Sequence, residues 1–136
     1  MNRNLTPNQE QKMASIEHIN VTVRSPERTA AMLQAVFGWH IRWKGPSQLG
    51  GRTIHVGSDD HYVAVYTDPA TAYTDAHFAK GRPLNHIGVL VDDLEATEAR
   101  VLAAGLTPFN HQDYAPGRRF YFLDADGTEY EVISYA

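Results

Sequence analysis

Two histidines occupy matching positions in two near-copies of one segment. Residues 17–29 read Glu-His-Ile-Asn-Val-Thr-Val-Arg-Ser-Pro-Glu-Arg-Thr, and residues 85–97 read Asn-His-Ile-Gly-Val-Leu-Val-Asp-Asp-Leu-Glu-Ala-Thr. Six of the thirteen positions, including His18 and His86, are identical at a constant offset of 68 residues. Neutral imidazole is a common metal ligand, and two strands related by pseudo-symmetry can bring their imidazoles to one place. The duplication therefore predicts a metal site assembled from two halves of the chain.

A carboxylate completes the predicted ligand set. In the expected last strand, Tyr130 and Val132 share one side and Glu131 lies on the other. If the first two cover a helix, Glu131 lies mid-strand on the histidine face, where a carboxylate is costly unless paired or metal-bound. Either histidine alone would more often be a solvent-facing or core residue. Two imidazoles and a carboxylate together favour Fe(II), Mn(II) or another divalent ion with open coordination positions.

Local patterns predict the elements that position these residues in the first half. From Ile16 the chain alternates with the period of two that a strand requires, so His18 faces away from the apolar side. The sequence Ser-Pro-Glu at 25–27 is typical of a helix start, and Gly38 ends that helix. Three more strands are expected, over residues 39–43, 52–56 and 62–66.

The second half repeats this plan. Residues 85–91 alternate like the first strand, and Asp92 with Glu95 forms a capping box for a helix that stops at Gly105. Strands are expected over residues 106–110, 119–123 and 129–134, the last two forming a hairpin. We therefore predict an α+β fold made of two tandem β-α-β-β-β modules.

The polar residues 1–14 are expected to form a disordered lead-in. Residues 15–136 are expected to form a single domain, with module one at 15–68, a linker at 69–83 and module two at 84–136. The linker is rich in small polar residues and contains prolines, which leaves room for at most one helical turn.

Composition excludes several classes of function. The net charge of −4 over 136 residues, without a basic run, argues against nucleic-acid binding. No apolar run approaches the roughly 20 residues of a membrane span, and the start shows no secretory signal pattern. The absence of cysteine excludes disulfides and thiolate zinc sites, so nitrogen and oxygen must hold any metal. A cytoplasmic protein is expected.

Three motifs carry a family resemblance. They are Ile-Glu-His-Ile-Asn-Val at 16–21, Leu-Asn-His-Ile-Gly-Val at 84–89 and Arg-Phe-Tyr-Phe-Leu-Asp-Ala-Asp-Gly-Thr-Glu-Tyr-Glu at 119–131. Together they resemble the vicinal oxygen chelate superfamily, which includes glyoxalase I, bleomycin-resistance proteins, extradiol dioxygenases and fosfomycin-resistance thiol transferases. The resemblance spans residues 15–135.

This resemblance implies a curved, cup-like mixed sheet with the helices on its outer face, and a homodimer. It also implies that His18, His86 and Glu131 bind the metal. In some members the halves pair across chains, so His18 would come from one subunit and the other two ligands from its partner. Whether one chain or two build the site stays open at this point.

One departure from the family pattern narrows the chemistry. Ala64 stands where a fourth ligand would align, and three ligands fit the dioxygenase-like and fosfomycin-resistance-like branches better than the isomerase-like ones. In the fosfomycin branch Tyr121 would reach the substrate, but the loop at 111–117 lacks the lysine and serines of a phosphonate pocket. Arg118 and Arg119 could contact an anion instead, although paired arginines entering a strand are usually solvated.

The resemblance implies a metal-dependent enzyme acting on a small oxygen-chelating substrate, with dioxygenase-like or lyase- or transferase-like chemistry. Fe(II) or Mn(II) is favoured, with Zn(II) and Ni(II) as alternatives. Tyr121, His111 and His55 are the candidates for moving protons. The structural alternatives are cross-strand packing for His55 and an exposed loop for His111. The alternative function is a metal-free protein of the bleomycin-resistance type that sequesters a small molecule.

Overall fold

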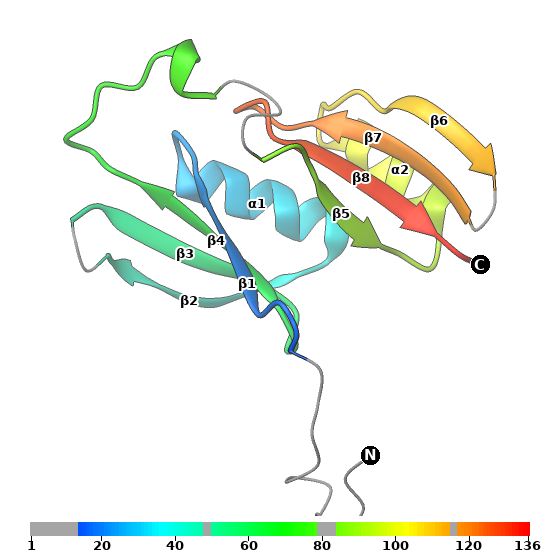
Figure 1. The fold of residues 1–136 in the computed structure, drawn as a ribbon, viewed down its shortest axis with the longest axis horizontal. Helices are drawn as coiled ribbons and strands as arrows, with labels where there is room; N and C mark the ends of the chain where they lie inside the picture. Colours follow the sequence, from blue (N-terminus) through cyan, green and yellow to red (C-terminus); the bar gives the residue numbers. More distant parts are fainter. Residues whose placement is uncertain (1–13, 48–49, 79–83, 115–116) are drawn as a thin grey trace, which may run out of the picture.

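The computed structural model describes residues 14–47, 50–78, 84–114 and 117–136. They form two four-stranded mixed sheets, each accompanied by one helix (Figure 1). The predicted α+β class and the two-module plan are therefore confirmed. The expected disorder of residues 1–14 falls almost entirely outside the described residues and stays a prediction.

Module one contains the elements β1 (His18–Thr22), α1 (Pro26–Phe37), β2 (His40–Pro46), β3 (Arg52–Gly57) and β4 (Tyr62–Thr67). Its sheet has the order β1-β4-β3-β2. The first strand pairs in parallel with the last, and the other neighbours are antiparallel. A short 3-10 helix, η1 (Asp75–Phe78), provides the helical turn expected in the linker.

Module two contains β5 (Ile87–Leu90), α2 (Leu94–Ala103), β6 (Phe109–Tyr114), β7 (Gly117–Leu123) and β8 (Glu129–Ser134). Its strand order, β5-β8-β7-β6, repeats that of module one. The first and last strands are again the parallel pair. The internal repeat in the sequence is thus a repeat of topology.

The two helix starts illustrate how far local signals carry. The Ser25 side chain accepts a hydrogen bond from the backbone N–H of Arg28, so Ser25 is the predicted N-cap of α1. In α2 the predicted N-cap Asp92 is wrong, because Asp93 has the extended backbone and accepts from the N–H of Ala96. Glu95 pairs with Arg118 rather than closing a capping box.

The sixth strand begins later than predicted. We expected it at residues 106–110, but it runs over Phe109–Tyr114. The chain leaves α2 through Gly105, whose φ is 81°, and Leu106 then packs against the core instead of joining the sheet. Asn110, with φ of 55°, forms an irregularity between the pairs that Phe109 and Gln112 make with β7.

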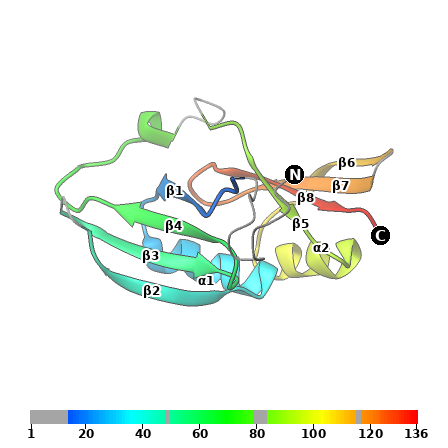
Figure 2. The same cartoon turned by 60° about the horizontal axis from the view of Figure 1, so that its bottom comes forward.

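A single hydrophobic cluster joins the two modules. It includes the buried side chains of Leu33 and Val56 from module one and of Phe120 and Val132 from module two. Phe37, at the end of α1, lies 6.2 Å from the rings of both Phe122 and Tyr130. The helices also contact each other, as the ribbon shows from two directions (Figures 1 and 2). The inner sheet faces therefore share one core.

A cluster of charged groups around one buried carboxylate also links the modules. The Asp126 carboxylate, only 1% exposed, accepts hydrogen bonds from Arg24 Nη1 at 3.0 Å and Arg28 Nη2 at 3.3 Å. Arg100 Nε donates to the carbonyl of Val36 at 2.9 Å. Because a buried carboxylate without a partner is costly, Asp126 needs these arginines, and the contacts help to hold the two modules together.

None of the helices in the described part of the chain is both long enough and apolar enough to cross a membrane.

Candidate metal centre

His86 and Glu131 meet on the face of the second sheet away from α2. This face points away from the shared core and corresponds to the inside of the expected cup; we call it the outer face of the sheet. The strand neighbours Ile87 and Tyr130 are buried in the core and are paired with each other in register. Side chains alternate along a strand, so His86 and Glu131 point the other way. His86 Nε2 lies 2.9 Å from Glu131 Oε1. The predicted placement of Glu131 on the histidine face is confirmed for this pair.

The Glu131 carboxylate lies in a mostly buried setting beside open space. Its side chain is 13% exposed, and its second oxygen accepts a hydrogen bond from Arg119 Nη1 at 2.8 Å. Gly88 pairs with Glu131 across the sheet, and a Cβ added at Gly88 would meet no atom within 4 Å. There is therefore room for a ligand next to the carboxylate.

Both predicted histidine ligands are oriented by the residue before them. His86 Nδ1 lies 2.8 Å from Asn85 Oδ1, and His18 Nδ1 lies 2.8 Å from Glu17 Oε1. If each Nδ1 carries the proton and donates it to this oxygen, each Nε2 keeps its lone pair. Metal-binding histidines commonly show this arrangement, with the distal N–H held by an oxygen. Each imidazole is therefore oriented as a metal ligand would be.

Tyr121 belongs to the same group. It pairs with Glu131 across the β7–β8 ladder, so both side chains point to the outer face. Its ring meets the His86 ring edge-on, with centroids 6.0 Å apart. We define the second half-site as the five residues His86, Arg119, Tyr121, Glu129 and Glu131.

The outer face of the first sheet carries a row of rings instead. His18 stacks on Tyr62 with centroids 4.8 Å apart, and Tyr62 stacks on His55 at 4.4 Å. Trp43 extends the row, 5.0 Å from His55. Ala64 lies buried between Asn20 and His55 in the strand register. We define the first half-site as these four rings together with Ala64.

His55 packs against rings of the neighbouring strands, the alternative that was weighed against a role in proton transfer. It lies on the same face as His18. Burial lowers the pKa of His55, and its electrostatic interactions with His18 and Arg42 lower it further. A lowered pKa favours the neutral imidazole, which can accept a proton. His55 is thus near one predicted ligand but lies in the other half-site from Tyr121.

His111 is directed away from both half-sites. Its Nε2 lies 2.7 Å from Glu98 on α2, and its ring stacks on Phe120, which is buried in the core. The irregularity at Asn110 decides this, because His111 then falls on the helix side of β6. The structure does not bring His111 to Glu131.

Arg118 and Arg119 were considered together in the sequence analysis, as anion contacts or, more often, as a solvated pair, and were not separated. Arg118 indeed points to the helix side, where it pairs with Glu95. Arg119 is only 12% exposed and contacts Glu131 on the outer face. The alternation of side chains along the strand could have shown this, since Arg119 lies two residues before Tyr121 and therefore on the same face.

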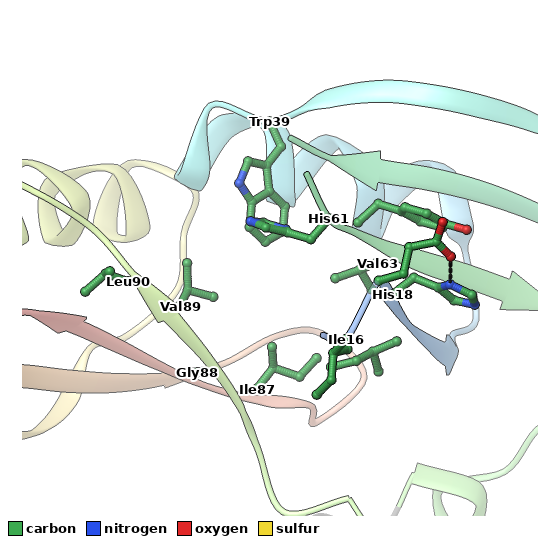
Figure 3. Close-up of a pocket in the computed structure, with 12 residues that line it drawn as sticks. Ile16, His18, Trp39, His61, Val63, Ile87, Gly88, Val89 and Leu90 are labelled. Atoms are coloured by element: carbon green, nitrogen blue, oxygen red, sulfur yellow. Dashed lines mark hydrogen bonds and ion pairs between the residues drawn. The ribbon is translucent and has the colours of Figure 1, made fainter. Parts of the chain in front are cut away.

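A cavity of about 500 Å³ separates the two modules along β1 and β5 (Figure 3). His18 lies at one end of this cavity and Leu90 at the other. Among the described residues of one chain, no group of three His, Cys, Asp or Glu side chains could hold a metal ion. The three predicted ligands are thus divided, with His18 in the first half-site and His86 with Glu131 in the second.

Comparisons with known proteins agree with this fold. The sequence matches the Glyoxalase/Bleomycin resistance protein/Dioxygenase superfamily over residues 15–132. The chain belongs to this superfamily, and the resemblance inferred from its motifs is confirmed. A comparison with curated proteins finds no match.

Solved structures share the fold at low sequence identity. A glyoxylase/bleomycin resistance protein/dioxygenase domain from Frankia sp. EAN1pec superposes with a TM-score of 0.73 at 17% identity, covering 90% of this chain and 98% of that one. The fosfomycin resistance protein FosX from Mesorhizobium loti gives a TM-score of 0.66 at 24% identity, covering 90% and 92%.

A third structure was determined with ligands. It is a mutant of FosX from Listeria monocytogenes complexed with Mn(II) and 1S,2S-dihydroxypropylphosphonic acid. Its TM-score is 0.67 at 17% identity, covering 90% of this chain and 93% of that one. The superfamily thus includes proteins that bind a divalent metal and a small molecule.

Proposed function

We propose that this protein is a metal-dependent enzyme in which His18, His86 and Glu131 hold one divalent ion, with Fe(II) or Mn(II) preferred over Zn(II) or Ni(II). A small substrate binds the ion through adjacent oxygens. The observation that carries the proposal is the 2.9 Å approach of His86 Nε2 to Glu131 Oε1 on an outer sheet face. The Mn(II) reported for a FosX structure of the same fold supports it.

The third ligand comes from a second copy of the chain in this proposal. β1 and β5 each lie at one end of their sheet order, and the edges of sheets are usually covered in natural proteins. The large apolar residues Ile16 and Leu90, at these edges, are 77% and 63% exposed. A homodimer with two-fold symmetry would cover them and would place two first half-sites against two second half-sites.

The ligands, Tyr121 and His55 have separate roles in the proposed site. A bound divalent ion supplies Lewis acidity, which stabilises negative charge on the substrate oxygens. The imidazoles act as neutral donors, and Glu131 neutralises part of the metal charge. The hydroxyl of Tyr121, beside His86, hydrogen-bonds to a substrate oxygen. Neutral His55 accepts the proton that a substrate hydroxyl loses on binding. The chemistry is dioxygenase-like or lyase- or transferase-like, and His111 has no assigned part in it.

A hybrid dimer tests the shared site. His18→Ala and Glu131→Ala chains, carrying different tags that do not bind metal, are co-expressed, and the doubly tagged dimer is isolated. If the half-sites meet across chains, one site of the hybrid has both defects and the other has none. We therefore expect one Mn(II) per hybrid dimer and none in either variant homodimer, measured by elemental analysis.

Two outcomes would contradict the proposal at different points. A hybrid without metal, alongside a fully loaded wild-type protein, would contradict a site shared between two chains. A wild-type protein that takes up no Fe(II), Mn(II), Zn(II) or Ni(II) would contradict the proposal that the protein is a metal-dependent enzyme.

A metal-free sequestering protein is the second candidate function. The stacked rings of the first half-site and the largely apolar cavity at β1 and β5 favour it, since both suit a flat organic ligand. The metal-free wild-type protein would then copurify with a small molecule, which mass spectrometry under native conditions would detect.

A further inference from the structure

We propose that the first half-site binds a flat aromatic compound, which stacks on the indole of Trp43. This inference goes beyond the proposed function, because it needs no metal ion and no residue of the second half-site. It gives the row of rings a role of its own, as a binding surface for one chemical class of ligand.

The arrangement of the rings is the first step. Tyr62 lies on β4, between the strands of His18 and His55, and its ring is nearly parallel to both of theirs, with interplanar angles of 9° and 22°. The guanidinium carbon of Arg42 also lies over Tyr62, 4.5 Å from the ring centroid. Trp43 ends the row, its indole tilted by 48° from His55. Because Trp43 is 47% exposed, much of this indole is accessible to a ligand.

The seat of the indole is the second step. Gly45 lies two residues after Trp43 and therefore on the same face of β2. A Cβ built on Gly45 would come within 2.8 Å of Cζ2 of the indole. The indole thus occupies the space that a side chain at position 45 would fill. Glycine weakens a strand interior and often marks a place where another group approaches closely, so β2 is built to hold this ring against the strand.

The chemistry of the rings is the third step. Aromatic rings attract one another in offset-stacked and edge-to-face arrangements, beyond the effect of burying their surface. Burial lowers the pKa of His55, so the ring beside Trp43 is neutral near neutral pH and requires no anion. The proposed dimer contact lies at β1, and β2 lies at the opposite end of that sheet. The indole of Trp43 therefore stays open to a small aromatic ligand in the dimer.

Two matched alcohols test the stacking. 1-Naphthol and decahydro-1-naphthol share a carbon skeleton and a hydroxyl group, but only the first is flat and aromatic. Calorimetry gives their dissociation constants for the full chain as purified. An NMR titration of the same protein after treatment with a chelator shows where they bind, because the chain has two tryptophans, Trp39 and Trp43. Trp39 lines the cavity at β1 and β5 (Figure 3), so its signal reports on that competing site.

We expect 1-naphthol to bind roughly threefold to tenfold more tightly than decahydro-1-naphthol, and to shift the indole N–H signal of Trp43 more than that of Trp39. Trp43→Leu keeps an apolar side chain without a ring and should remove this preference. Gly45→Ala should weaken 1-naphthol binding about threefold, because the indole must move away from the added methyl group. Trp39→Phe is the control and should change both dissociation constants by less than about twofold.

Several outcomes would overturn the inference. They are equal affinities for the two alcohols, no binding of either, and a preference for 1-naphthol that Trp43→Leu retains. A response of Trp39 alone would place the ligand in the cavity and would overturn it as well. If Trp43→Leu fails to fold, the preference of the wild-type protein and its two tryptophan signals still decide. A wild-type protein that binds no metal would contradict the proposed function but would leave these measurements unaffected.

Discussion

In both modules a histidine stands at or just before the strand that pairs in parallel with the last strand of its sheet. In module one that last strand presents Tyr62 opposite His18 and Ala64 opposite Asn20. In module two it presents Glu131 opposite Gly88, with Glu131 2.9 Å from His86. One backbone plan thus supports a row of rings in one half-site and a charged pair in the other.

This difference indicates which half-site is suited to binding a metal and which to contacting a substrate. Stacked rings stabilise each other and offer flat apolar surface, but the first half-site supplies a single predicted metal ligand, His18. The second half-site has a carboxylate, an imidazole and a guanidinium within hydrogen-bond distance. We therefore expect module two to supply two of the three metal ligands, and module one to supply the third and to shape the wall that a substrate contacts.

The largest effect should come from removing a metal ligand, as in the two ligands that the second half-site supplies. Glu131→Ala and His86→Ala should each abolish stoichiometric metal, because one remaining imidazole or carboxylate with His18 cannot hold an ion tightly. Elemental analysis of protein purified without a histidine tag measures this. His77→Ala, in η1, is the control and should keep its metal. Retained metal in both ligand variants would end the metal assignment.

A carboxylate introduced into the first half-site should test whether the space beside the stacked rings excludes a charged group. Ala64→Glu should lower the free energy of unfolding by about 3 kcal/mol, because the carboxylate would be buried beside Tyr62 and His55. Asn20→Glu is the matched control, since it alters the exposed partner of the same cross-strand pair and should cost about 0.5 kcal/mol or less. Urea denaturation measures both, and equal losses would contradict the assigned difference.

The residues before the histidines should have a smaller effect that is similar in the two modules. Asn85→Ala and Glu17→Ala should each weaken Mn(II) binding about tenfold, because the imidazole loses the oxygen that orients it. Gln34→Ala, on the exposed side of α1, serves as the control. Titration of Mn(II) followed by electron paramagnetic resonance measures the affinity. An effect of Asn85→Ala alone would mean that His18 does not bind the ion.

The smallest effect concerns the hairpins of the two modules. Burial raises the pKa of Asp124 to about 6, although the hydrogen bonds that it accepts from the backbone N–H groups of Thr128 and Asp126 lower that pKa. The stabilisation from the protonated form is present below the unfolded pKa of 3.8 and is lost as pH rises through 6. The corresponding turn of module one has the exposed Asp59 and Asp60 instead.

Unfolding free energies between pH 4 and pH 7 should therefore contain a fall of about 1 kcal/mol or more that Asp124→Asn removes. Asp60→Asn should leave the fall unchanged. Comparing each variant with the wild type isolates this contribution, and a pH dependence equal in Asp124→Asn and the wild type would contradict it.

Much of the second half-site followed from alternation alone. Tyr130 and Val132 are apolar and Glu131 lies between them, so one choice of buried face directs the carboxylate outward. The same alternation, applied from Tyr121 along its strand, would have placed Arg119 on this face; Arg119 was treated in the sequence analysis as a solvated surface residue. His111 could not be placed in this way, because the irregularity at Asn110 shifts the register of β6.

The sequence by itself determined the two modules, the face that bears each histidine and the carboxylate that joins His86, because these depend on periodicity within single strands and helices. The tertiary structure decided that His18 and the His86–Glu131 pair occupy separate half-sites of one chain. That separation depends on contacts between distant segments, chiefly Phe37 against the second sheet and Asp126 with Arg24. Local patterns carry no information about such packing, since it arises only when the two modules share a core.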